Sequence, residues 1–201
     1  MRKEPLTYND HNKVKFSLGH RWYYFDDWGF TIMAPPKCGS TAIKQFIYMH
    51  ELGDSVKFLK QFEVQGKAYV VVRNPFHRFT SLWKSKCRDK APLRNKRVHG
   101  MTPEELMDYI EDGAKDVHFT PQITLLGNIN ATLIPLESLN WWWHQSGFGS
   151  LGKFNVTEGE AEIGDELKQR VITFYADDLE LYHKAQCDLC WDTVVSPIVD
   201  I

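Results

Sequence analysis

Two continuous apolar runs, each followed by a segment that is apolar on one face only, dominate the first half of the chain. Residues 30–33 and 68–72 have the composition of short strands, and the second run is apolar throughout, as in a strand buried on both faces. Residues 42–49 and 76–83 place their apolar side chains at helical spacing. The repeated strand-loop-helix pattern predicts an α/β fold, with a mainly parallel central sheet flanked by helices.

A further helix and a further strand are predicted in the middle of the chain. Thr102 is a capping residue followed by Pro103 in the first helical turn, and the apolar pattern ends near residues 112–113. A short apolar run at residues 132–134 predicts the strand. We expect one domain over residues 1–201, with its core at about residues 28–185.

The polar loop between the first strand and its helix has the features of an anion-binding site. The loop ends at a helix N-terminus, where backbone N–H groups lack intrahelical partners and the helix dipole favours negative charge. Gly39 allows close approach of a ligand to the backbone, Ser40 and Thr41 add hydroxyl groups, and Lys37 adds an ammonium group. The sequence therefore predicts a phosphate at this loop.

A second polar position follows the second strand. Arg73 stands at the carboxyl end of residues 68–72, and Ser81 lies two turns into the next helix. In open α/β folds, ligands bind in the crevice beyond the carboxyl ends of the parallel strands. We expect Arg73 and Ser81 to face that crevice.

Together the two segments resemble a known pair of motifs. A Pro-Lys-x-Gly-Ser-Thr loop followed by Arg-Asn-Pro-x-x-Arg-x-x-Ser is similar to the signature of sulfotransferases that use 3′-phosphoadenosine 5′-phosphosulfate (PAPS). The resemblance implies that the first loop holds the 5′-phosphosulfate, whereas Arg73 and Ser81 hold the 3′-phosphate. Carried over by position, the residues of the first loop are Lys37, Cys38, Gly39, Ser40, Thr41 and Ala42.

Later segments resemble the carbohydrate branch of these enzymes. Residues 118–122 are similar to its His-Trp-x-Pro-Gln stretch, residues 134–139 to a strand ending in Glu-x-Leu, and residues 171–182 to its acidic and aromatic closing segment. The implied reaction is sulfuryl transfer from PAPS to a hydroxyl group, with a carbohydrate as the favoured acceptor and adenosine 3′,5′-bisphosphate (PAP) as the other product.

Catalysis of this kind needs positive charge at the leaving oxygen and a base for the acceptor hydroxyl. Lys37 meets the first need. His118 is the first choice for the base because imidazole titrates near neutral pH, and Glu51 and Glu63 are alternatives. No metal is required, since the protein supplies the cations. Cys187 and Cys190 form a single Cys-x-x-Cys pair, which has only two of the four ligands of a structural zinc site.

Three other interpretations remain open. The loop and Arg73 are also compatible with an ordinary helix cap and a structural ion pair. A P-loop kinase is disfavoured because Lys37 precedes Gly39 instead of following the glycines. The third interpretation is a non-catalytic protein that binds a nucleotide or an anionic glycan. A basic segment of the chain is compatible with this third interpretation. That segment contains Lys84, Lys86, Arg88, Lys90, Arg94, Lys96 and Arg97.

Composition is that of an ordinary globular chain: 201 residues, 43% hydrophobic and 25% charged, with a formal net charge of −2. The isoelectric point of about 6.4 and the lack of a recognition motif argue against nucleic acid as a partner. The sequence shows neither a signal-peptide pattern nor an apolar stretch long enough to span a membrane, so we expect a soluble or cytoplasmic protein, similar to a bacterial or viral relative of the family.

Overall fold

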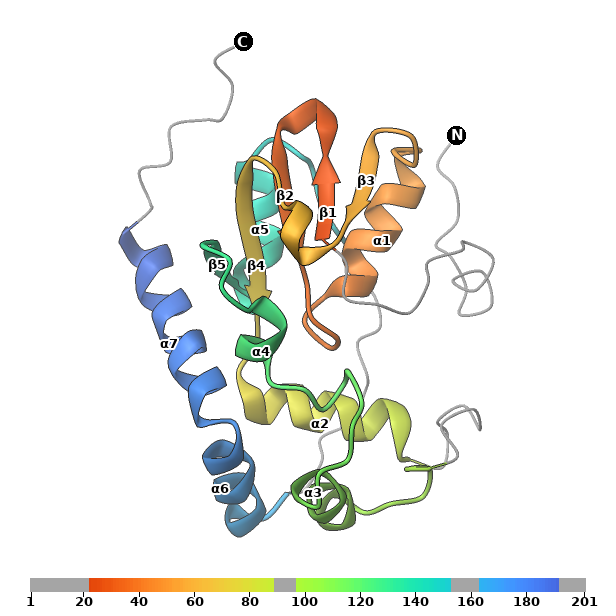
Figure 1. The fold of residues 1–201 in the computed structure, drawn as a ribbon, viewed down its shortest axis with the longest axis vertical. Helices are drawn as coiled ribbons and strands as arrows, with labels where there is room; N and C mark the ends of the chain where they lie inside the picture. The colour runs from red at the N-terminus through yellow and green to blue at the C-terminus, as the bar shows by residue number, and fades with distance from the viewer. Residues whose placement is uncertain (1–21, 89–96, 153–162, 192–201) are drawn as a thin grey trace.

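A computed structural model describes residues 22–88, 97–152 and 163–191 (Figure 1). The strands are β1 (Trp22–Phe25), β2 (Phe30–Met33), β3 (Val56–Leu59), β4 (Lys67–Val72) and β5 (Thr132–Pro135). The helices are α1 (Ser40–Met49), α2 (Pro75–Lys86), α3 (Pro103–Glu111), α4 (Gln122–Leu126), α5 (Leu139–Gln145), α6 (Asp165–Phe174) and α7 (Ala176–Trp191). The helices and strands that the sequence predicts are therefore confirmed within three residues of their expected bounds.

The described strands form one sheet in the order β3-β1-β2-β4-β5. The prediction of a mainly parallel sheet is wrong. The pairs β2–β4 and β4–β5 are parallel, whereas β1 pairs antiparallel with both β2 and β3. A short 3₁₀ turn at Asp26–Trp28, closed by Gly29 with φ 64°, joins β1 to β2 and forces a hairpin. The parallel half, which carries the predicted site, is as expected.

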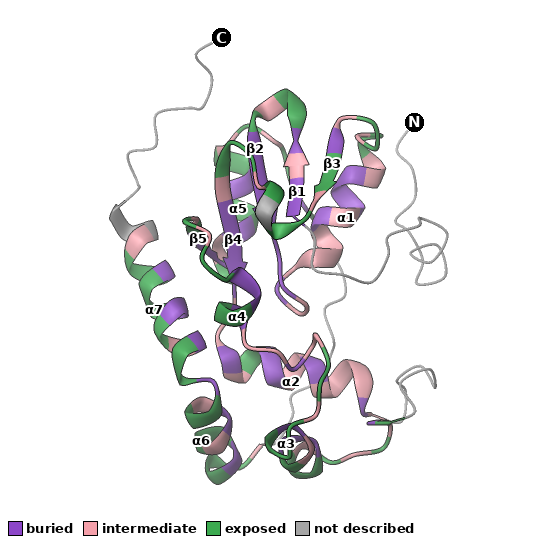
Figure 2. Cartoon of the chain, in the orientation of Figure 1, coloured by how far each residue is buried: buried purple, intermediate pink, exposed green. Residues whose placement is uncertain are grey.

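Side chains of β2, β4 and β5 alternate between two apolar clusters on opposite faces of the sheet. Ile32, Val71 and Ile134 pack on one face with buried residues of α1 and α5. Met33, Val72 and other residues on the opposite face pack with α4 and α7. Figure 2 shows these strands as almost wholly buried. Helices on both faces explain why β4 is apolar along most of its length.

A third apolar cluster lies beyond the lower edge of the sheet in Figure 1 and is made by α2, α3 and α6. Phe79 and Leu82 of α2 pack there with Leu106 and Ile110 of α3 and Val171 of α6. In α3, Thr102 and Glu105 form the reciprocal side-chain and main-chain bonds of a capping box, as the sequence predicts. This helical layer faces the carboxyl ends of β2 and β4, the end of the sheet at which the sequence predicts a ligand.

Candidate active site

The loop between β2 and α1 leaves the start of α1 open. Gly39 precedes the helix with φ 86°, and no side chain of the described residues caps its first turn. A Cβ atom at Gly39 would lie 2.9 Å from Cδ1 of Leu136, so glycine is needed for packing as well as for its backbone angle. Ser40 and Thr41 in the first turn are half-buried. Their backbone N–H groups stand where an anion is favoured.

Lys37 has an unusual backbone conformation in this loop. Its φ of 71° lies in the left-handed region, which is uncommon for a residue with a side chain. Two arginines hold the loop: Nη1 of Arg73 donates to the carbonyl oxygen of Lys37 at 3.0 Å, and Nε of Arg78 donates to that of Pro36 at 3.1 Å. Unfavourable backbone angles persist where neighbouring contacts enforce them, often at functional sites.

Arg73 and Lys37 thus bring the two predicted motifs into direct contact. Arg73 extends from the end of β4 to the loop, and its Nε atom is buried with no hydrogen-bond partner among the described residues. A buried cationic donor left unpaired is costly, and such a group is normally satisfied by a partner. The unpaired Nε of Arg73 is therefore a candidate donor to a ligand.

The side chain of Lys37 reaches α2. Its Nζ donates to Oγ of Ser85 at 2.8 Å. Ser81 lies one helical turn before Ser85 and therefore on the same face of α2, where it is half-buried. Lys37, Arg73 and the Ser81 face of α2 therefore line one region between the sheet and the helical layer.

Positive charge is concentrated in this region. Burial, together with Lys86 and Arg73, lowers the pKa of Lys37 to about 8. Burial is also the main cause that lowers the pKa values of Lys86 and Arg73. Cations crowded in this way repel one another, so a bound anion would relieve an existing cost.

Cys38 and Ala42, the other predicted residues of the loop, face the protein interior. The Cys38 thiol is fully buried and donates to Oε1 of Gln122 at 3.1 Å, and burial raises its pKa to about 12. The N–H groups of Cys38 and Ala42 bond to the carbonyl oxygens of Pro35 and Gly39. Both residues thus support the loop from inside.

His118 lies near the same cations. Its Nδ1 is 2.6 Å from Oδ1 of Asp116. Its pKa is lowered mainly by burial and then by Lys86, with a smaller effect from Lys37, whereas Asp116 opposes this shift. The other two candidate bases are elsewhere. Glu51 is exposed beyond the far end of α1, a helix about 15 Å long, and Glu63 is exposed and bonds to the backbone N–H of Lys60.

Comparison with known proteins settles the family. Residues 35–142, more than half of the chain, match the model of the sulfotransferase family. The chain belongs to the sulfotransferase family. No significant match is found among curated proteins or among solved structures. The matched segment contains Lys37, Arg73, Ser81 and His118, whereas residues 171–182 lie outside it. Membership indicates a transferase of sulfuryl groups.

A buried polar network that sequence reasoning missed supports the site of this sulfotransferase. Gln122 accepts from the N–H of Arg73 at 2.9 Å and donates to its carbonyl oxygen at 2.8 Å. Asp178 accepts from the N–H groups of Gln122 and Ile123, and it lies 3.8 Å from Arg78. Arg78 belongs to the Arg-Asn-Pro-x-x-Arg-x-x-Ser motif and Gln122 to the stretch similar to His-Trp-x-Pro-Gln, which was the available signal. Asp178 carries no such signal.

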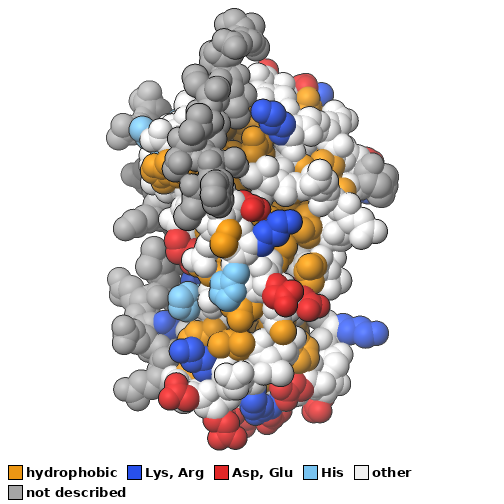
Figure 3. All heavy atoms as spheres, turned by 90° about the vertical axis from the view of Figure 1, so that its left-hand side faces the viewer, with side chains coloured by type: hydrophobic (Ala, Val, Ile, Leu, Met, Phe, Trp, Pro, Cys, Tyr) orange, Lys and Arg blue, Asp and Glu red, His pale blue; other side chains and the backbone are white. Residues whose placement is uncertain are grey.

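The basic segment predicted from the sequence is only partly described. Lys90, Arg94 and Lys96 of the basic segment lie outside the described residues, as does the side chain of Cys190. On the face shown in Figure 3, acidic and basic side chains are mixed and no single sign of charge prevails. Trp142 and Trp143 are core residues, whereas Trp141 is 48% exposed.

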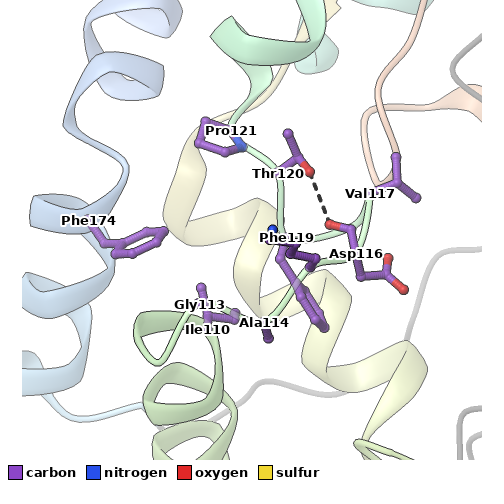
Figure 4. A pocket seen from close by; sticks show the side chains of 10 residues that line it. Ile110, Gly113, Ala114, Asp116, Val117, Phe119, Thr120, Pro121 and Phe174 are labelled. Atoms are coloured by element: carbon purple, nitrogen blue, oxygen red, sulfur yellow. Dashed lines mark hydrogen bonds between the residues drawn. The ribbon is translucent and has the colours of Figure 1, made fainter.

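A groove of about 600 Å³ lies beside the residues 113–121 (Figure 4). It is lined by the end of α3, by Phe119, Thr120 and Pro121, and by Phe174 of α6. Neither Lys37 nor Arg73 lines this groove.

The described residues show neither a metal cluster nor a membrane-spanning helix. No group of three or more His, Cys, Asp or Glu side chains in the described ranges is arranged to hold a metal ion. None of the helices in the described ranges combines the length and the apolar character needed to cross a bilayer.

Proposed function

We propose that this sulfotransferase moves the sulfuryl group of PAPS to a hydroxyl group of a carbohydrate. The observation that carries the proposal is the contact of Arg73 with the Lys37 loop, in which the guanidinium group keeps a buried, unpaired Nε. Two anion-binding elements in contact suit a substrate with phosphate groups at both ends of one nucleoside. The open start of α1 and the crowded cations support the same substrate.

In this proposal, different residues hold the two ends of PAPS. The N–H groups at the start of α1, the hydroxyl groups of Ser40 and Thr41, and Lys37 would hold the 5′-phosphosulfate. Arg73 and Ser81 would hold the 3′-phosphate. Lys37 is predominantly protonated at neutral pH with its pKa of about 8, and a bound phosphate favours the charged form further.

In the reaction, the acceptor oxygen forms a bond to sulfur while the bond from sulfur to the bridging phosphate oxygen breaks. The acceptor proton passes to Nε2 of His118, and PAP leaves with the electron pair of the broken bond. Lys37 stabilises the negative charge that develops on the leaving oxygen. His118 later releases its proton to solvent.

A carbohydrate acceptor is favoured by the stretch that contains His118 and Gln122. This stretch resembles that of carbohydrate sulfotransferases, and Gln122 bonds both to the Cys38 thiol and to the main chain of Arg73. The segment that resembles this branch is therefore built into the site. Half-buried Lys86 adds a cation beside His118, which suits an acceptor that itself carries negative charge.

Calorimetric titration with PAP tests the donor site first. We expect micromolar affinity, near −8 kcal/mol, for the wild-type chain. Arg73→Ala should weaken it by about tenfold to a hundredfold, since hydrogen bonds to charged groups contribute about 1.5–3 kcal/mol. Ser81→Ala should weaken it less, and His77→Ala, an exposed change on the same helix, should have no effect. Equal affinity in all four proteins would contradict the proposed site.

A transfer assay then separates an enzyme from a binding protein. Sulfate-labelled PAPS is incubated with a panel of glycans, and labelled glycan is measured for the wild type and for Lys37→Ala. Label transferred by the wild type and lost in the variant supports the proposal. PAP binding without transfer to any glycan, together with glycan retention by both proteins, would favour a non-catalytic binder. Magnesium-dependent ATP turnover without PAP binding would favour a kinase.

A further inference from the structure

We propose that Asp116 is a positioning residue for His118. Its carboxylate keeps the proton of the imidazole ring on Nδ1 and so presents Nε2 in the unprotonated form to the acceptor hydroxyl. This inference rests on the proposed role of His118 as the base.

Two contacts from one carboxylate oxygen carry the inference. Oδ1 of Asp116 accepts from the backbone N–H of His118 at 2.8 Å and lies 2.6 Å from Nδ1 of its ring. An ionised carboxylate only accepts hydrogen bonds, so Nδ1 must donate and carries the proton. In neutral imidazole, a proton on Nδ1 leaves Nε2 as the acceptor. The tautomer that a base needs is therefore set by this pair.

The backbone around the pair is held in place on both sides. The carbonyl oxygen of Asp116 accepts from the N–H groups of Phe119 and Thr120 and from the hydroxyl of Thr120. Nη2 of Arg78 donates to the carbonyl oxygens of His118 and Thr120. Figure 4 shows the Asp116 carboxylate turned away from Phe174 and the groove. Asp116 is thus among the residues that line the groove, and its carboxylate contacts His118.

Electrostatics give the carboxylate a second effect. Burial, Lys86 on α2 and Lys37 on the phosphate loop all lower the pKa of His118, and Asp116 raises it. Burial alone would raise the pKa of Asp116, but the bonds from His118 and the charge of Lys86 outweigh that effect and lower it. Asp116 therefore stays ionised near neutral pH. Its removal should lower the pKa of His118 further.

The decisive variant is Asp116→Asn. The asparagine carbonyl can still accept from the backbone N–H of His118, which preserves the turn, but the negative charge is lost. A ring-nitrogen NMR titration of the full chain without substrate reports both the tautomer and the pKa of His118. We expect a lower pKa and a smaller fraction of the Nδ1–H form. Asp112→Asn, an exposed change of equal charge at the end of α3, should alter neither.

Kinetics then test whether positioning matters for transfer. We expect Asp116→Asn to lower kcat by on the order of a hundredfold with little change in KM, since a general base contributes about 10²–10⁴-fold. The acidic limb of the pH profile should move to lower pH, Asp116→Glu should recover part of the rate, and Asp116→Asn should add nothing to His118→Ala.

Two results would overturn the inference: an unchanged tautomer and pKa in Asp116→Asn, or a further loss of kcat in the His118→Ala background. A failure of the proposed function would give a different result from either of these. If the NMR changes occur but the wild type transfers no sulfate, the positioning of His118 stands and the assigned reaction does not.

Discussion

In our proposal, the two strand-loop-helix units of this protein bind anions by different means. At the start of α1, Gly39 leaves the backbone N–H groups without a side-chain cap from the described residues. At the start of α2, Oδ1 of Asn74 accepts from the N–H groups of Phe76 and His77, and Pro75 has no N–H to offer. The first helix can therefore use its backbone as a donor, whereas the second must use side chains, Arg73 and Ser81.

In this proposal the same strand-loop-helix motif serves one substrate in two ways. Backbone donors suit a group that must be held closely near the reacting bond, because they are fixed by the helix itself. Side-chain donors suit the more distant phosphate, and they depend on the network that orients them. The substitutions below separate the two units, beginning with the contact that joins them.

The largest effect is expected from Arg78→Ala. Arg78 lies on α2 but binds the loop of the first unit, and it is only 3% exposed beside the fully buried Asp178. Removing one partner of a buried ion pair typically costs about 3–5 kcal/mol, because the other charge is left without compensation. Urea denaturation measures the free energy of unfolding.

Arg170→Ala provides the control for Arg78→Ala. Arg170 pairs with Asp108 and Glu111 at the surface, where such pairs contribute about 0–1 kcal/mol. If both variants lost the same small amount of stability, Arg78 would not be the link between the two units.

Lys37→Ala removes the only side-chain ammonium that the first unit places on its loop. Loss of a donor to developing charge typically lowers the rate by about a hundredfold or more. The rate is measured at saturating PAPS, so that weaker binding does not contribute. Lys67→Ala, an exposed change at the opposite end of β4, should keep the wild-type rate. A normal kcat in Lys37→Ala would place the catalytic charge elsewhere.

The affinity for PAP should depend on pH through the first unit. Because the pKa of Lys37 is lowered from 10.5 to about 8, the ammonium is lost above that pH in the free protein. Affinity should then fall by up to about tenfold per pH unit, as expected for binding that requires one proton. Calorimetry between pH 6.5 and 9.5 measures this, and Lys37→Arg should abolish the dependence, because arginine stays charged.

The lowered pKa of Lys37 has the opposite effect on the stability of the ligand-free protein, which should increase with pH. Between pH 8 and 10.5 the unfolded lysine binds more protons than the folded one, so the free energy of unfolding should rise over this interval. A flat stability profile in wild type and Lys37→Ala alike would argue against the buried ammonium.

Asn74→Ala should have the smallest effect. Loss of a helix N-cap costs about 1 kcal/mol, and the start of α2 does not hold the substrate in our proposal. We expect a lower melting temperature with PAP affinity close to that of the wild type, as measured by thermal denaturation and calorimetry. A large loss of affinity would mean that both helix starts bind anions.

The parts of the fold that could be predicted are those whose signals are local. The apolar runs of β2 and β4, the glycine loop and the capping box of α3 are each contained in a short segment. The edge strand β3 was not predicted, because it exposes Lys57 and Phe58 and so has no continuous apolar run. The hairpin of β1 was not predicted either, because its antiparallel pairing with β2 and β3 is a tertiary feature. Short strands with a polar position carry little periodic signal.

In the candidate site, too, some features have a local sequence signal and others depend on contacts between distant segments. Sequence placed Lys37 and Arg73 after neighbouring strands, but their contact, 36 residues apart, depends on the pairing of β2 with β4. The partners of Gln122 are 49, 56 and 84 residues away, in segments that no spacing rule connects. Asp116 is two residues from His118, and the Asp-x-His spacing was a local signal that could have been read.

The position of Gln122 has a consequence for how substrates are taken up. Its side chain joins the phosphate loop to the end of β4, and its segment continues through Pro121 to His118. A displacement of that segment by an acceptor therefore reaches the donor loop through a short chain of buried contacts. If the acceptor displaces this segment in that way, the two affinities become interdependent, and by linkage each substrate would alter the binding of the other by the same factor.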